Sequence, residues 1–137
     1  MISNLKKQRR SSRRKGATTV EMAFCLPVLF LFLFASYEMA RANMMLHAAE
    51  SAAYEGARTG IVPGASQQSI EDSVAFVMNS VGASDFDVAV TPSVIQRDTE
   101  TVRVEVSVSL RDNTILSGIF LQDPVFVGAT EMKRESF

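Results

Sequence analysis

Residues 17–37 read ATTVEMAFCLPVLFLFLFASY and contain a single charged side chain, that of Glu21. Within them, residues 22–35 hold no charged or strongly polar side chain. At about 1.5 Å of rise per residue, a helix over residues 17–37 is roughly 30 Å long, which matches the hydrocarbon core of a bilayer. The sequence therefore predicts a transmembrane helix.

Charge is distributed unevenly around this segment. The 137 residues include 14 Lys and Arg and 15 Asp and Glu, for a formal net charge of −1. Seven of the basic residues lie in residues 1–16, which contain no acid, so residues 17–137 carry a charge of −8. Basic residues beside the N-terminal end of a membrane segment stay in the cytoplasm. We expect a single-pass membrane protein with a cytoplasmic leader over residues 1–16. Its C-terminal domain would lie beyond the membrane, in the periplasm if the membrane is the inner membrane of a bacterium and in the equivalent exoplasmic space otherwise.

The composition disfavours most classes of enzyme. Cys25 and His47 are the only Cys and His, which excludes a multi-His metal site, a Cys-based zinc site and an internal disulfide. We expect no catalytic residue, cofactor, metal or small-molecule substrate, and the place of the basic cluster beside an apolar helix argues against nucleic acid. The carboxylate pairs are expected to face water at caps and strand edges: Glu71 with Asp72, Asp85 with Asp87, and Asp98 with Glu100.

Besides a plain uncleaved anchor, the N-terminal segment could be a cleaved signal peptide, a lipidated segment or a membrane helix that is retained after its leader is removed. A signal-peptidase site at residues 40–42, Ala-Arg-Ala, would release a secreted binding domain that starts at Asn43. Against it, Glu38 crowds the site and the helical pattern runs on without a break. Lipidation of Cys25 is disfavoured because the bulky Phe24 precedes it.

Gly16, Ala17 and Glu21 form the third candidate, a processing site at the end of the basic leader. A cut after Gly16 would make Ala17 a charged N-terminus, with Glu21 about 6 Å further along the helix. A carboxylate in a bilayer is costly and is generally paired. The expected partner is an α-amino group, its own or a neighbour's; alternatively, Glu21 only reaches the cytoplasmic interface.

Residues 15–58 resemble the TadE family of pilin-like proteins from the tight-adherence (Tad/Flp) pilus system. The shared features, in chain order, are Gly16, the pair Val20-Glu21, the pair Leu26-Pro27, Glu38, Arg41, and the alanines 48, 49, 52, 53 and 57. Met22 departs from the pilin pattern, where an aromatic residue tends to follow the Glu.

The resemblance implies a pseudopilin or minor pilin that a prepilin peptidase cuts between Gly16 and Ala17. The implied partners are inner-membrane lipid, other pilin-like subunits and the pilus assembly platform, with incorporation into an extracellular pilus. In such a subunit Glu21 and Pro27 would pack against neighbouring subunits.

The helix is predicted to continue beyond the membrane, so that residues 17–60 form one TadE-like segment. One narrow face of it consists mostly of small side chains: Ala42, Met45, Ala49, Ala52 and Gly56. This face either packs against neighbouring subunits or seats the chain's own C-terminal domain. A second face carries Asn43, His47, Glu50, Tyr54 and Arg58, and we expect His47 to be solvated.

Residues 61–137 are predicted to form a small α+β domain. Gly60, Pro63 and Gly64 end the first helix. A second helix is expected to be capped by Ser66 or Ser69, to bury Ile70, Val74, Val77 and Val81, and to end at Gly82.

Strict alternation over residues 101–110, TVRVEVSVSL, predicts a strand with one buried face. Alternation at residues 86–90 predicts another strand, and Val125, Val127 and Ala129 indicate a last one. The short apolar stretch of residues 115–121 is expected to cover the sheet, with a helix as one option. The expected fold class is α+β: a long N-terminal transmembrane helix, a second helix and a small antiparallel sheet, a pilin-like architecture.

Overall fold

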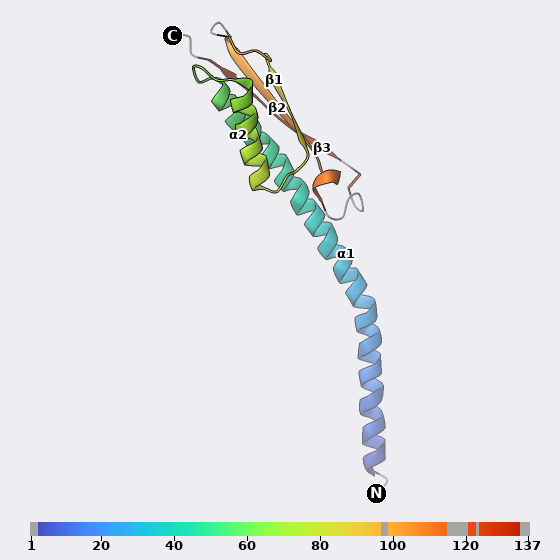
Figure 1. The fold of residues 1–137 in the computed structure, drawn as a ribbon. Helices are drawn as coiled ribbons and strands as arrows, with labels where there is room; N and C mark the ends of the chain where they lie inside the picture. The colour runs from blue at the N-terminus through green and yellow to red at the C-terminus, as the bar shows by residue number, and fades with distance from the viewer. Residues whose placement is uncertain (1–2, 97–98, 115–120, 123, 135–137) are drawn as a thin grey trace. The chain divides into compact units, whose positions relative to one another are not determined.

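The computed structural model describes residues 3–96, 99–114, 121–122 and 124–134, with side chains from residue 16 onward. In chain order its elements are α1 (Ser3–Gly60), α2 (Gln67–Ser80), β1 (Phe86–Thr91), β2 (Thr101–Ser109), the short 3₁₀ helix η1 (Arg111–Asn113) and β3 (Val125–Lys133) (Figure 1). These elements confirm the α+β fold class. The chain forms two compact units, residues 1–37 and 38–137, so residues 38–60 of the long helix belong to the C-terminal unit.

Helix α1 begins earlier than the sequence predicts. We expected a helix from Ala17, whereas the helical backbone starts at Ser3 and includes the basic leader. The leader is rich in Lys and Arg, which are good helix formers, and residues 3–15 contain neither Gly nor Pro. Pro27 lies inside α1, where its missing N–H removes one hydrogen bond from the helix.

Helix α2 begins with a capping box. The Ser66 hydroxyl accepts a hydrogen bond from the backbone N–H of Ser69 (3.2 Å), and the Ser69 hydroxyl accepts one from the backbone N–H of Ser66 (3.1 Å). Ser66 is thus the cap. Gly82 follows the helix with a φ of 68°, a conformation that favours glycine.

The buried face of α2 differs in part from the expected one. Ile70 and Val74 are fully buried as predicted, and the third buried residue is Met78. Val77 and Val81 are only half-buried against the core. The reason is that Ile70, Val74 and Met78 repeat at four residues and so line one face of the helix, and Val77 lies beside that row.

The three strands form an antiparallel sheet in the order β1-β2-β3. The central strand β2 buries Val102, Val104, Val106 and Val108 and turns its intervening residues outward, as its alternation predicts. Val106 is paired with Val88 of β1 and with Gly128 of β3, so these residues share the inner face of the sheet.

The strand at the C-terminal end, β3, is predicted from Val125, Val127 and Ala129, but the alternate residues are the ones that face inward. Val125 and Val127 are 60% and 49% exposed, and Phe126, Gly128, Thr130 and Met132 lie on the inner side. At Gly128 an added Cβ would overlap the backbone of Ala49 and Glu50 in α1. The strand therefore approaches α1 backbone to backbone at Gly128, which fixes its register and sends Val125 and Val127 to the outer face.

The core lies between the inner face of the sheet and the two helices. Its buried residues from α1 are Ala42, Met45, Ala48, Ala49, Ala52, Ala53 and Ala57. At Gly56 an added Cβ would lie 2.8 Å from Val74 Cγ2 and 3.2 Å from Val104 Cγ1, so α1 packs closely on both α2 and β2. The expected cover at residues 115–121 lies outside the described residues except for Leu121, which is half-buried against the core.

Candidate functional site

The N-terminal unit supplies one membrane-type segment. By length and composition, the described chain has one helix able to cross a membrane, within residues 16–60. The apolar side chains of residues 20–34 that are large enough to pack are exposed, among them Phe24 (75%) and Phe32 (66%). Such a surface is stable in contact with lipid or with other apolar helices, and it fits a single-pass membrane anchor.

The proposed processing residues follow one another on this helix. Gly16, Ala17 and Glu21 lie on α1 and are exposed, as is Pro27, which is expected to pack against neighbouring subunits. An added Cβ at Gly16 would meet nothing within 4 Å, so packing within the described chain does not require a glycine there. A need for glycine at position 16 would have to come from a protein that recognises this segment.

The small-residue face of α1 is occupied within the chain. Ala42 is 5% exposed, and Met45, Ala49 and Ala52 are fully buried beneath α2 and the sheet, beside the close contacts of Gly56. Of the two alternatives that the sequence left open, the structure describes the one in which this face seats the chain's own domain. In this arrangement these positions have no surface left for a neighbouring subunit.

Glu38 is the first residue of the C-terminal unit and is completely buried. Its Oε1 accepts a hydrogen bond from the backbone N–H of Leu121 at 3.0 Å, across 83 residues of sequence. A buried carboxylate is tolerated only when its oxygens are hydrogen-bonded or paired. Glu38 therefore attaches the connection between β2 and β3 to α1.

Arg41 makes the densest set of polar contacts in the same region. Its Nε donates to the carbonyl of Asn113 (3.0 Å), Nη1 to the carbonyl of Val81 (2.8 Å) and Nη2 to the carbonyl of Gly82 (2.9 Å). The carbonyls of Val81 and Gly82 follow the C-terminal end of α2, where a cation is favourable. One guanidinium thus joins α1 to the end of α2 and to η1.

Asn113 completes this cluster and is only 7% exposed. Its Oδ1 accepts from the backbone N–H of Ser84 (2.8 Å), and its Nδ2 donates to the carbonyls of Asp85 (3.0 Å) and Ser109 (2.9 Å). Sequence reasoning missed Asn113, because the partners of its side chain lie up to 29 residues away and no local pattern marks them. We refer to Glu38, Arg41 and Asn113 as the attachment cluster.

Comparison with known families marks the same part of the chain. A family model described as TadE-like protein matches residues 16–58. We refer to residues 16–58, which are similar to this family, as the TadE-like segment. No curated protein and no solved structure matches the chain.

The TadE-like segment contains both the membrane-type helix and two members of the attachment cluster. Glu38 and Arg41 lie inside it, whereas their partners Leu121, Val81 and Asn113 lie outside it. The TadE-like segment thus supplies Arg41 as a hydrogen-bond donor and Glu38 as an acceptor to the rest of the C-terminal unit. This gives a structural role to two residues that carried the resemblance.

The remaining candidate residues are on the surface. His47 and Glu50 lie 3.3 Å apart as a solvated pair, with side chains that are 73% and 58% exposed. Glu71 and Asp72 accept hydrogen bonds from neighbouring glutamines of α2, and Asp85, Asp87 and Glu100 are solvent-facing, whereas Asp98 lies outside the described residues. Among the residues with described side chains, no group of three or more His, Cys, Asp and Glu is placed to hold a metal ion.

Proposed function

We propose that this protein is a pseudopilin or minor pilin, a single-pass membrane protein that takes part in the assembly of a Tad/Flp-type pilus. The observation that carries the proposal is the TadE-like segment, residues 16–58, on a helix apolar enough to cross a membrane. A TadE-like segment indicates association with the Tad pilus and pilin-like partners. The protein acts by packing against other subunits and not by catalysis.

The proposed topology follows from charge. Seven basic residues precede Ala17, and residues 17–137 carry −8. The leader therefore stays in the cytoplasm and the C-terminal unit lies in the periplasm. The protein resides in the inner membrane until it is drawn into the pilus by the assembly platform.

The proposed processing step is a cut between Gly16 and Ala17 by a prepilin peptidase. It removes the basic leader after the leader has set the topology. The new amino group of Ala17 is then the charge that Glu21 pairs with, in the same subunit or in a neighbour, because an unpaired carboxylate in the bilayer is costly.

The alternative function is a secreted binding domain released by a cut after Ala42. It is disfavoured by the attachment cluster, because the cut would remove Glu38 and Arg41 from the domain. Asn113, Val81 and Gly82 would then lose their shared cationic donor. An anchored protein keeps all of these contacts.

N-terminal sequencing of the protein made together with its cognate prepilin peptidase tests the proposal. We expect the mature chain to start at Ala17 and to remain in the membrane pellet. Gly16→Leu should block the cut, because a bulky side chain would meet the peptidase at the scissile bond. A soluble chain that starts at Asn43 would instead identify a signal peptide, and an intact Met1 in the wild-type protein would identify an uncleaved anchor.

Glu21→Gln separates processing from assembly. We expect membrane insertion and the cut after Gly16 to remain within about twofold of wild type, while incorporation into pili falls at least about tenfold, as a lost charge pair in a bilayer would predict. Quantitative immunoblots of sheared pili and membranes measure both. Glu71→Gln, an equal change in the C-terminal unit, should leave both unchanged. Normal incorporation of the Glu21 variant would rule out the pairing role.

A further inference from the structure

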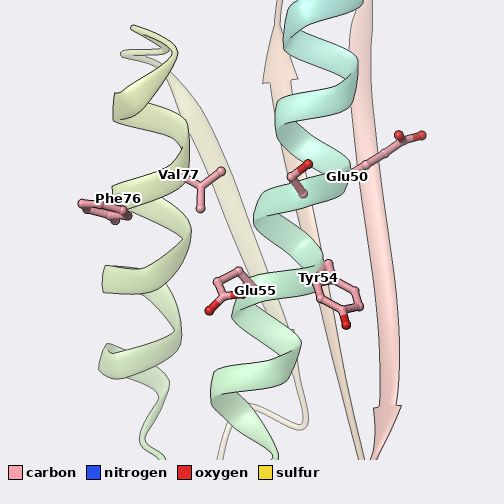
Figure 2. Close-up of a pocket in the computed structure, with 6 residues that line it drawn as sticks. Glu50, Tyr54, Glu55, Phe76 and Val77 are labelled. Carbon is pink, nitrogen blue, oxygen red and sulfur yellow. The ribbon is translucent and has the colours of Figure 1, made fainter.

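A groove lies between α1 and α2 on the surface of the C-terminal unit. It is lined by Glu50, Ser51, Tyr54 and Glu55 of α1 and by Phe76 and Val77 of α2. Figure 2 shows Val77 and Glu55 between the two helices, with Phe76 and Tyr54 farther out on either side. The hollow next to it, at the start of α2, shares Glu55. We refer to the first hollow, lined by the six residues named above, as the α1/α2 groove.

The rims of the α1/α2 groove are aromatic and exposed. Phe76 is 78% exposed and Tyr54 is 55% exposed. Isolated exposed apolar residues are common, but two aromatic rings on either side of one hollow form a surface of the kind that binding sites use. Aromatic side chains bury a large area at a small cost in side-chain entropy, so they are frequent anchors of interfaces.

The charges around the rings are mainly negative. Glu50 and Glu55 belong to the groove. The Glu50 carboxylate lies 3.3 Å from the His47 ring, and Glu55 pairs with Arg58 at 3.6 Å. All four side chains are 43% or more exposed, so both pairs are weak and can be exchanged for contacts with a partner. Exposed carboxylates and exposed rings that line one groove suit Lys or Arg, which can pair with a carboxylate or lie over a ring.

The same charges argue against a second copy of this chain. Apart from the buried Glu38 and the hydrogen-bonded Arg41, residues 38–80 carry one further Arg and four further carboxylates: Glu50, Glu55, Glu71 and Asp72. Two such surfaces face to face would place like charges together, which is unfavourable. The occupant that this face fits is a basic one.

We propose that the α1/α2 groove docks a helix of another pilin-like subunit, one that presents an aliphatic side chain flanked by Lys or Arg. The aliphatic side chain packs between Tyr54 and Phe76 on Val77, and the flanking cations pair with Glu50 and Glu55. The partner helix is thus amphipathic, and the side chains that it inserts into the groove lie one helical turn apart. This inference rests on the proposed function for the identity of the partner, and the geometry of the groove supplies its chemistry.

The first test measures binding with a defined probe. The full chain in nanodiscs of zwitterionic lipid is titrated with a fluorescent 18-residue helical peptide that carries Leu at one-turn spacing flanked by Lys, with empty nanodiscs as the background. We expect saturable binding that weakens with salt. Replacing the peptide's Lys by Glu should weaken binding at least tenfold. Equal binding of the two peptides, or no binding of the Lys peptide, would overturn the proposed chemistry.

Matched charge reversals locate the site. Glu50→Lys with Glu55→Lys should weaken binding of the Lys peptide at least tenfold. The control is Asp87→Lys with Glu105→Lys, the same change in charge on the outer face of the sheet, where Glu105 also has an exposed Arg partner at 3.3 Å. It should bind as the wild type does. An equal loss in both double variants would indicate general attraction to an acidic protein and would contradict docking in the groove.

The second test identifies the partner in cells that assemble the pilus. A photoreactive benzophenone amino acid at position 76 should give an adduct with another pilin-like subunit, and the same group at position 107, on the outer face of the sheet, should not. A product of twice the chain's mass would instead identify a second copy and overturn the proposal. If the chain starts at Ala17 but gives no adduct, docking in the groove is contradicted and the pseudopilin assignment is kept. If the chain starts at Asn43, the pseudopilin assignment is contradicted, whatever the peptide-binding test shows for the groove.

Discussion

Gly128→Val is expected to detach β3 from α1 and to lower the free energy of unfolding of the C-terminal unit by at least about 3 kcal/mol. An added Cβ at this position would overlap the backbone of Ala49 and Glu50, and backbone atoms in a regular helix cannot move aside cheaply. The strand also pairs with β2 along nine residues, so its displacement would disturb the sheet as well. Urea unfolding of the full chain in a mild detergent, followed by circular dichroism, measures the loss.

The control is Ala129→Val, the neighbouring position on the same strand. Its side chain points to the outer face and is exposed, and Val is a good strand residue, so the expected change is within about 0.5 kcal/mol. Gly128→Ala should lie between the two variants. If Gly128→Val were as stable as Ala129→Val, the close approach of β3 to α1 would be wrong.

The elements with one dominant pattern could be predicted from the sequence. The apolar run of residues 22–35 allows no other secondary structure in a membrane than a helix, and the valines of β2 alternate without exception. The capping box at Ser66 is a local hydrogen-bond pattern of the kind that sequence can reveal. In each case the information lies within a few neighbouring residues.

The facing of β3 could not be read in the same way. Residues 125–127 are Val-Phe-Val, so both alternating sets begin with large apolar side chains. The decision is made by Gly128, whose significance lies in a contact with Ala49, far away in the sequence. Similarly, the pattern on α1 shows which residues are small, and only the positions of α2 and β2 show what fills the space beside them.

The attachment cluster shows the same limit at the site. The order of Glu38 and Arg41 after the apolar segment is visible in the sequence, but their partners lie 40 to 83 residues away. No local rule assigns a carbonyl at Val81 or an N–H at Leu121 to them. The α1/α2 groove cannot be found from the sequence for a related reason. The periodicity assigns Tyr54 to a second face of the long helix, and only the packing of α2 brings Phe76 to the same hollow.

A second large effect is expected at Arg41, where Arg41→Met removes the donor shared by three backbone carbonyls. The carbonyls of Val81, Gly82 and Asn113 would lose hydrogen bonds of 2.8 to 3.0 Å from a charged group. We expect the free energy of unfolding of the C-terminal unit to fall by roughly 3 kcal/mol, since hydrogen bonds to charged groups each contribute about 1.5–3 kcal/mol and are not additive. Met retains most of the apolar stem, so the variant tests the guanidinium and not the packing.

Two further variants decide whether the geometry of the guanidinium is what matters. Arg41→Lys keeps the charge but offers a compact ammonium that cannot reach carbonyls in three directions, so it should recover less than half of the loss. Arg103→Met removes an exposed Arg whose ion pair with Glu105 spans 3.3 Å, and the expected change is below about 1 kcal/mol. Hydrogen exchange should show the Arg41→Met loss first as faster exchange of the Ser84 N–H, which Asn113 holds. Full recovery by Lys, or equal losses from Arg41→Met and Arg103→Met, would mean that the domain is held to its helix by apolar packing alone and that the attachment cluster contributes little to its stability.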